Sequence, residues 1–115
     1  MQHYDSKDSK FSRKLRKGAP DDFAAFLEFD QQVFADEGHT LSKKTRELIA
    51  IGVAATTQCP HCIEIHSRGA AKAGATEEEL SEAIMVAMAL RAGGAMTHGW
   101  MAMKFHEDEA SQSDE

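Results

Sequence analysis

Signals for helix starts and helix ends recur along the chain from residue 20 onward. No segment alternates apolar and polar residues at every second position, as a half-buried strand does. Alanine and methionine are abundant and β-branched residues are sparse, a balance that favours helices over strands. These patterns predict an all-α fold, and a length of 115 residues fits one domain.

Caps and apolar periodicity predict five consecutive helices. The first begins at Pro20 and ends near Gly38. The second covers about residues 43–57, and Ser42 can cap its start. This second helix is apolar around most of its circumference, so we expect it at the centre of the fold or buried between subunits.

The other three predicted helices lie in the second half of the chain. One starts at Pro60 and stops at Gly74, because glycine tolerates the left-handed turn that ends many helices. A capping box from Thr76 to Glu79 opens the next, and the pair Gly93-Gly94 is expected to break it. The last predicted helix carries residues 96–105.

The two ends of the chain carry opposite charges. Residues 1–18 contain six basic and two acidic side chains, whereas residues 107–115 contain five acidic ones. We expect residues 1–18 to form a basic arm that is solvated or packs on a neighbouring subunit. We expect residues 107–115 to form an acidic, disordered tail, which leaves residues 19–106 as the folded domain.

The overall charge and hydropathy exclude several classes of partner. A net charge of −6 argues against a nucleic-acid partner, because such proteins neutralise phosphates with basic side chains. No apolar run approaches the roughly 20 residues that span a bilayer, and the N-terminus lacks the apolar segment of a signal peptide. We therefore expect a cytoplasmic protein with no membrane partner.

Both cysteines lie in one motif, Cys59-Pro60-His61-Cys62. In a reducing cytoplasm such a pair is more often catalytic or metal-binding than structural. The motif falls at a predicted helix start, where free N–H groups and the helix dipole lower the pKa of a thiol. Their spacing allows the cysteines to form a disulfide within the first turn. Cys62 and His66 are four residues apart and share a face, so His66 can accept the Cys62 proton.

A further ionisable group, Glu47, comes from the preceding predicted helix. If the two helices form an antiparallel hairpin, Glu47 lies opposite residue 70, about one turn (~5 Å) beyond His66. A glutamate side chain can cover much of that gap, directly or through a water, and would then orient the imidazole or relay its proton. The competing interpretation is an exposed Glu47 that pairs with Lys43 or Lys44.

A metal site is an alternative use of the same residues. Ligand chemistry is available from six side chains, namely Cys59, Cys62, His66, Glu47, His61 and His98. Structural zinc sites usually take their ligands from two separated pairs, and the chain has no second cysteine pair. We expect neither a metal nor another bound cofactor, and a metal-binding module remains the alternative.

The full spacing is Glu47, eleven residues, Cys59-x-x-Cys62, three residues and His66. This pattern resembles the signature of the AhpD-like alkylhydroperoxidase branch of the carboxymuconolactone decarboxylase superfamily. The resemblance covers roughly residues 20–106. It implies an all-helical bundle of about five to six helices around a central helical hairpin, assembled as a homotrimer or homohexamer.

The resemblance also implies a reaction, the reduction of hydroperoxides by the cysteine pair. Cys62 would attack the peroxide and become a sulfenic acid, and Cys59 would resolve it as a disulfide. His66 and Glu47 would form a proton relay, and His61 would line the site. An external dithiol donor, in some family members a lipoyl-bearing protein, would reduce the disulfide again.

The same superfamily contains lactone decarboxylases, which generally lack the Cys-x-x-Cys pair. A lyase of this type would use His66 and Glu47 as its acid and base. The cysteine pair weighs against this second alternative.

Overall fold

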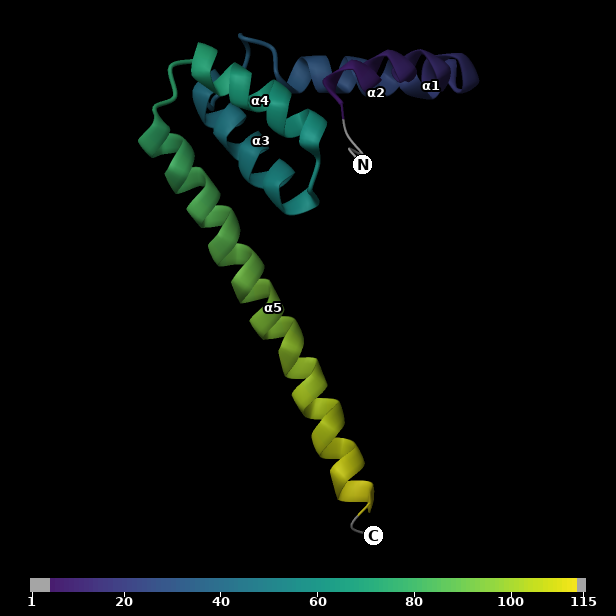
Figure 1. The fold of residues 1–115 in the computed structure, drawn as a ribbon, viewed down its shortest axis with the longest axis vertical. Helices are drawn as coiled ribbons and strands as arrows, with labels where there is room; N and C mark the ends of the chain where they lie inside the picture. Colours follow the sequence, from purple (N-terminus) through teal and green to yellow (C-terminus); the bar gives the residue numbers. More distant parts are fainter. Residues whose placement is uncertain (1–4, 114–115) are drawn as a thin grey trace.

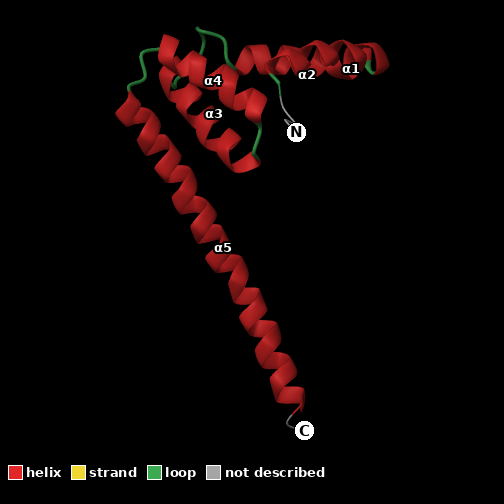
Figure 2. Ribbon diagram, viewed as in Figure 1, coloured by secondary structure: helices red, strands yellow, loops and turns green. Residues whose placement is uncertain are grey.

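The computed structural model describes residues 5–113. Within this range all regular structure is helical and no residue lies in a strand (Figure 2). The elements are η1 (a 3-10 helix, Ser6–Phe11), α1 (Ser12–Gly18), α2 (Pro20–Val33), α3 (Lys43–Thr57), α4 (Pro60–Lys72) and α5 (Glu77–Ser113). The predicted all-α fold is therefore confirmed. None of these helices combines the length and the apolar character needed to cross a membrane.

A hairpin of α3 and α4 forms the centre of the fold, as predicted. The hydroxyl of Ser42 caps α3 by accepting a hydrogen bond from the N–H of Thr45 at 3.1 Å. At the other end Gln58 adopts a left-handed conformation with φ 58°. This residue reverses the chain, so that α4 begins two residues later at Pro60 in the antiparallel direction. The tight turn sets the register in which α3 and α4 face each other.

The small core lies where α3 is covered by α4 on one side and by the first half of α5 on the other (Figure 1). Its buried apolar residues come from all three helices: Ile51, Ala54, Ala70 and Ala87. Gly52 has no side chain, and a Cβ there would lie 3.7 Å from the carbonyl oxygen of Ala83. α3 is thus the central helix, in keeping with its apolar circumference.

Two parts of the chain project away from this core. The antiparallel pair α1 and α2 extends to one side, and the second half of α5 extends far beyond the hairpin (Figure 1). The radius of gyration is 20.1 Å, whereas a compact chain of this length has a radius of about 13 Å. The single chain is therefore much more extended than a self-contained globular domain.

The sequence predictions were wrong about the C-terminal third of the chain. The pair Gly93-Gly94 does not break a helix, since α5 runs without interruption from Glu77 to Ser113. Each glycine costs a helix only about 1 kcal/mol relative to alanine, and strong helix formers surround the pair. Residues 107–113 are helical rather than disordered, and residues 114–115 lie outside the described range.

Two boundaries near the N-terminus also differ from prediction. The first predicted helix ends at Val33 rather than near Gly38, which lies in the following loop with φ 83°. The described part of the basic arm, residues 5–18, is folded as η1 and α1. The described residues contain five α-helices, the number expected. The additional helix α1 offsets the absence of a separate C-terminal helix.

Candidate active site

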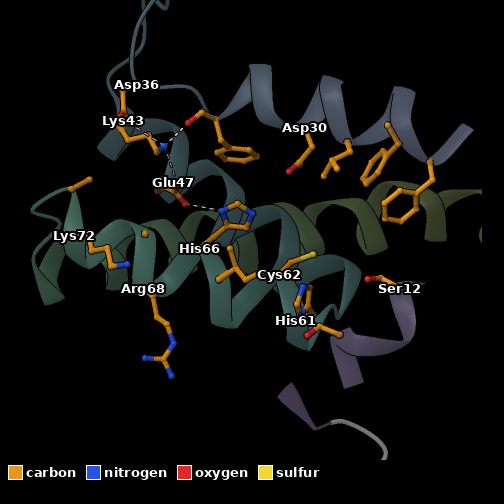
Figure 3. Close-up of a pocket in the computed structure, with 18 of the residues that line it drawn as sticks. Ser12, Asp30, Asp36, Lys43, Glu47, His61, Cys62, His66, Arg68 and Lys72 are labelled. Atoms are coloured by element: carbon orange, nitrogen blue, oxygen red, sulfur yellow. Dashed lines mark hydrogen bonds and ion pairs between the residues drawn. The ribbon is translucent and has the colours of Figure 1, made fainter. Parts of the chain in front are cut away.

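His66 on α4 and Glu47 on α3 form a direct hydrogen bond, with Nδ1 and Oε2 2.7 Å apart (Figure 3). Glu47 is only 4% exposed, so the interpretation of Glu47 as an exposed surface charge was wrong. An ionised carboxylate can only accept, so the hydrogen bond places the imidazole hydrogen on Nδ1. Nε2 of His66 is then left to exchange a proton with another group.

The hairpin geometry predicted a gap of about one helical turn between Glu47 and His66. Gly69 explains how the side chain of Glu47 crosses this gap. A Cβ at position 69 would lie 2.8 Å from Cδ of Glu47 and 2.9 Å from both of its carboxylate oxygens. The carboxylate therefore lies directly on the backbone of α4. Glycine is suited to such a close approach, but the sequence does not single out Gly69, because a Cβ at Gly93, Gly94 or Gly99, which also lie inside a helix, would meet nothing within 4 Å.

Phe34 and Arg46 complete the surroundings of the imidazole. The ring of Phe34 lies against that of His66, with centroids 4.4 Å apart and planes at 31°. Arg46 is buried, and its guanidinium donates to the carbonyl oxygens of Val33 at 2.6 Å and Leu41 at 3.2 Å. These bonds hold the end of α2, and hence Phe34, beside His66. Neither residue was predicted from the sequence, because both act through contacts between segments distant along the chain.

Lys43 links the same loop to the buried carboxylate. Its ammonium donates to the carbonyl oxygen of Phe34 and lies 3.4 Å from Oδ1 of Asp36 and 4.0 Å from Oε1 of Glu47. An ion pair with Lys43 was considered only for an exposed Glu47. The structure has this ion pair, although Glu47 is buried. The positive charge partly compensates the carboxylate, which would otherwise be costly to bury.

A disulfide joins Cys59 and Cys62 at the start of α4, with their Cα atoms 5.3 Å apart. Cys59 is the N-cap residue, and its sulfur accepts a hydrogen bond from the N–H of Cys62 at 3.3 Å. The two sulfurs differ in their surroundings, because Cys62 lines an open groove beside His66 whereas Cys59 does not. The predicted placement of the pair at a helix start is therefore observed.

The groove in front of Cys62 lies between α2 and α4 and has a volume of about 1750 Å³ (Figure 3). His61, His66 and Glu47 line its inner part together with Cys62. His61 is exposed and lies at the groove near Cys62 (Figure 3). Most of the wall is apolar and comes from η1, α1, α2, the residue that follows α2, and α4: Phe11, Leu15, Phe23, Phe26, Leu27, Phe34 and Ile65.

The metal-binding alternative gains no support from these side chains. Among residues 5–113 no three histidine, cysteine, aspartate or glutamate side chains are grouped as the ligands of a metal ion would be. His98, considered as a zinc ligand, lies on the exposed second half of α5 and is not among the residues lining the groove.

Comparison with known proteins agrees with the helical architecture. An uncharacterized protein of the cox locus of Paracoccus denitrificans is 51% identical over 79 residues, which are 69% of each chain. A carboxymuconolactone decarboxylase family protein from Legionella pneumophila superimposes with a TM-score of 0.65 at 35% identity, covering 90% of this chain and 91% of that one. A protein from Methanobacterium thermoautotrophicum gives a TM-score of 0.67 at 30% identity, covering 76% and 97%.

A family-wide sequence profile extends this agreement over most of the chain. The profile described as "Carboxymuconolactone decarboxylase family" matches residues 20–105. This range contains the central hairpin, the cysteine motif and the Glu47–His66 pair. The chain is therefore a member of the carboxymuconolactone decarboxylase family, within the AhpD-like superfamily.

Proposed function

We propose that the protein is a thiol-dependent hydroperoxide reductase of the AhpD type. The observation that carries the proposal is the disulfide-forming pair Cys59 and Cys62, placed one helical turn from the buried Glu47–His66 hydrogen bond. A histidine that is oriented by a carboxylate is suited to move a proton to and from a neighbouring sulfur.

The first step oxidises Cys62. His66 takes the proton of the Cys62 thiol, and the thiolate attacks the terminal oxygen of a hydroperoxide. The O–O bond breaks, the sulfur becomes a sulfenic acid, and the leaving alkoxide takes the proton back from His66 to form an alcohol. Glu47 keeps the imidazole oriented and stabilises its protonated form.

The second step forms the disulfide, and the third returns the enzyme to its reduced state. The thiol of Cys59 attacks the sulfur of the Cys62 sulfenic acid, and the oxygen leaves as water. An external dithiol, such as a lipoyl group on a carrier protein, then reduces the disulfide through two thiol–disulfide exchanges. The protein itself needs no bound cofactor in this scheme.

The lining of the groove favours organic hydroperoxides over hydrogen peroxide. The wall next to Cys62 and His66 is largely apolar, and an apolar alkyl group gains free energy by leaving water for such a surface. Hydrogen peroxide has no such group and would gain little from this lining.

A lactone-decarboxylase type of lyase is the competing function. Glu47 and His66 could act as base and acid without the cysteines, so their geometry supports both reactions. Cys62 lines the same groove. Because the cysteine pair has no role in the lyase reaction, its presence favours the redox reaction.

The decisive experiment is to add one equivalent of cumene hydroperoxide to the fully reduced protein and to measure its mass. We expect the loss of two hydrogens and a mapped Cys59–Cys62 disulfide. Cys59→Ser should instead accumulate a sulfenic acid on Cys62, which dimedone traps, and Cys62→Ser should not react. Thiols that survive the peroxide would overturn the proposal, whereas turnover of a carboxymuconolactone by the double serine variant would establish the lyase.

A further inference from the structure

The second half of α5 presents an apolar face that the other described elements, within residues 5–113, leave exposed. Every residue from 94 to 112 is exposed. The large side chains include Met96 at 61%, Trp100 at 62% and Met103 at 71% exposure. A soluble helix seldom leaves such a face in water, so another surface is expected to cover it.

The spacing of this face is that of a helix packed lengthwise against another element. Small and apolar residues recur at alternating intervals of four and three along α5, namely at Met85, Ala89, Ala92, Met96, Gly99 and Met103. We call this set the α5 stripe. A period of 3.5 residues is typical of helices in long side-by-side contact. α5 contacts α3 through Ala83 and Ala87 instead, which lie on the opposite side of the helix from the stripe.

The groove between α2 and α4 is the complementary open surface. Its outer wall exposes Phe11, Leu15 and Phe26 to at least half of their full area. The α1–α2 pair that carries this wall projects from the hairpin (Figure 1). A helix seated in the groove would cover both the aromatic wall and the inner part that contains Cys62.

We propose that the α5 stripe of one copy packs into this groove on a second copy of the chain. The chain cannot fill its own groove, because α5 is a continuous helix of 37 residues that points away from α1 and α2 (Figure 1). To fold back, α5 would have to break at a point such as Gly93-Gly94.

Charge selects this arrangement over a pairing of two α5 helices. The C-terminal end of α5 carries Glu107, Asp108 and Glu109, and its first turn carries Glu77, Glu78 and Glu79. A pairing of two α5 helices along their full length, parallel or antiparallel, would therefore bring acidic clusters together, which is unfavourable. α1, which borders the groove, carries four basic side chains: Arg13, Lys14, Arg16 and Lys17. The acidic end of the stripe and the basic α1 are thus complementary.

This contact would close the site as well as build the oligomer. The visiting helix would cover the groove from the solvent side, so that Cys62 and His66 would face an enclosed pocket instead of an open surface. If each copy receives a helix from the next, the contacts form a closed ring where the rotation between copies closes. The docking does not depend on the reaction, because it follows from apolar surface and charge alone.

Isotope-mixed cross-linking tests the contact directly. Light and ¹⁵N-labelled protein are mixed, dissociated at high salt, reassembled and treated with a carbodiimide that joins amines to carboxylates. We expect linked peptides that join Lys14 or Lys17 to Glu107 or Glu109, with one partner light and the other heavy. Linked peptides in which both partners always carry the same label would show that α5 folds back on its own chain, and would overturn the proposal. A monomeric wild-type protein in light scattering would do so too.

Charge reversal gives an independent measurement. Glu107→Lys with Glu109→Lys should shift the mass in light scattering toward the monomer and the emission of Trp100, the one tryptophan, toward the red. Lys14→Glu with Lys17→Glu should do the same, and the fourfold variant should recover the oligomer. The matched control is Glu28→Lys with Glu37→Lys, which changes two exposed acids outside the groove. Helicity by circular dichroism should stay unchanged, and a fourfold variant that remains monomeric would contradict the pairing.

Discussion

The carboxylate of Glu47 occupies the space that any side chain at position 69 would need, since a Cβ there would lie 2.8 Å from Cδ of Glu47. The absence of a side chain at Gly69 is therefore what allows Glu47 to reach His66 at 2.7 Å. A mid-helix glycine costs about 1 kcal/mol of stability, and at this position it provides the contact on which the proposed proton relay rests.

Replacing Gly69 by alanine should separate activity from stability. Gly69→Ala gains about 1 kcal/mol of helix propensity, but overpacking against Glu47 costs about 1–3 kcal/mol. The melting temperature should therefore change little or fall modestly, while peroxide reduction should drop at least tenfold as the carboxylate moves away from His66. Gly94→Ala is the matched control, because a Cβ there meets nothing within 4 Å, and it should stabilise the protein without loss of activity. Full activity in Gly69→Ala would contradict the role of this close approach.

The charge of Glu47 should matter more than its volume. Glu47→Gln keeps the shape of the side chain but removes the charge that stabilises a protonated His66. We expect the rate of Cys62 oxidation by cumene hydroperoxide to fall by about 10²-fold, the lower range for loss of a positioned acid–base group. Stopped-flow measurement of the reduced variant gives this rate. Glu78→Gln, an exposed acid on α5, should react like the wild type, and an unchanged rate in Glu47→Gln would remove Glu47 from the relay.

Arg46 should act on stability through the end of α2. Arg46→Met fills a similar volume but leaves the carbonyl groups of Val33 and Leu41 without their donor. Losing two partly buried charge-assisted hydrogen bonds should lower the free energy of unfolding by about 2–4 kcal/mol. Urea denaturation followed by circular dichroism measures this change. Arg91→Met, on an exposed part of α5, should stay within about 0.5 kcal/mol of the wild type.

Acid should remove the contribution of Glu79 to stability. Its pKa lies below the ordinary value of 4.5, first because Lys44 donates to it and then because the N–H of Thr76 does so. Since the pKa in the folded state is the lower one, the contribution is present above pH 4.5 and is lost as the pH falls through the folded value. Melting curves of wild type and Glu79→Gln should therefore differ at pH 7 and converge toward pH 3. A difference that persists unchanged at pH 3 would assign the effect of Glu79 to packing instead.

Local signals predicted the hairpin because they are encoded within a few residues of each boundary. Ser42 and Pro60 each mark a helix start by their own chemistry, and the structure has α3 and α4 at the predicted positions. The pair Gly93-Gly94 was wrongly predicted to break a helix. Each glycine costs about 1 kcal/mol, and this cost is small because helix formation is cooperative and helical residues flank the pair on both sides.

The sequence by itself determined the all-α class, the central hairpin, and the grouping of Cys59, Cys62 and His66 on one helix, because helical spacing places them together whatever else the chain does. Only the tertiary structure decided that Glu47 is buried and bonded directly to His66, that Phe34 lies against the imidazole, and that Arg46 holds the end of α2. These contacts join different elements, and their distances depend on how closely two backbones approach. That approach is set here by Gly69, whose effect appears only when α3 and α4 are packed together.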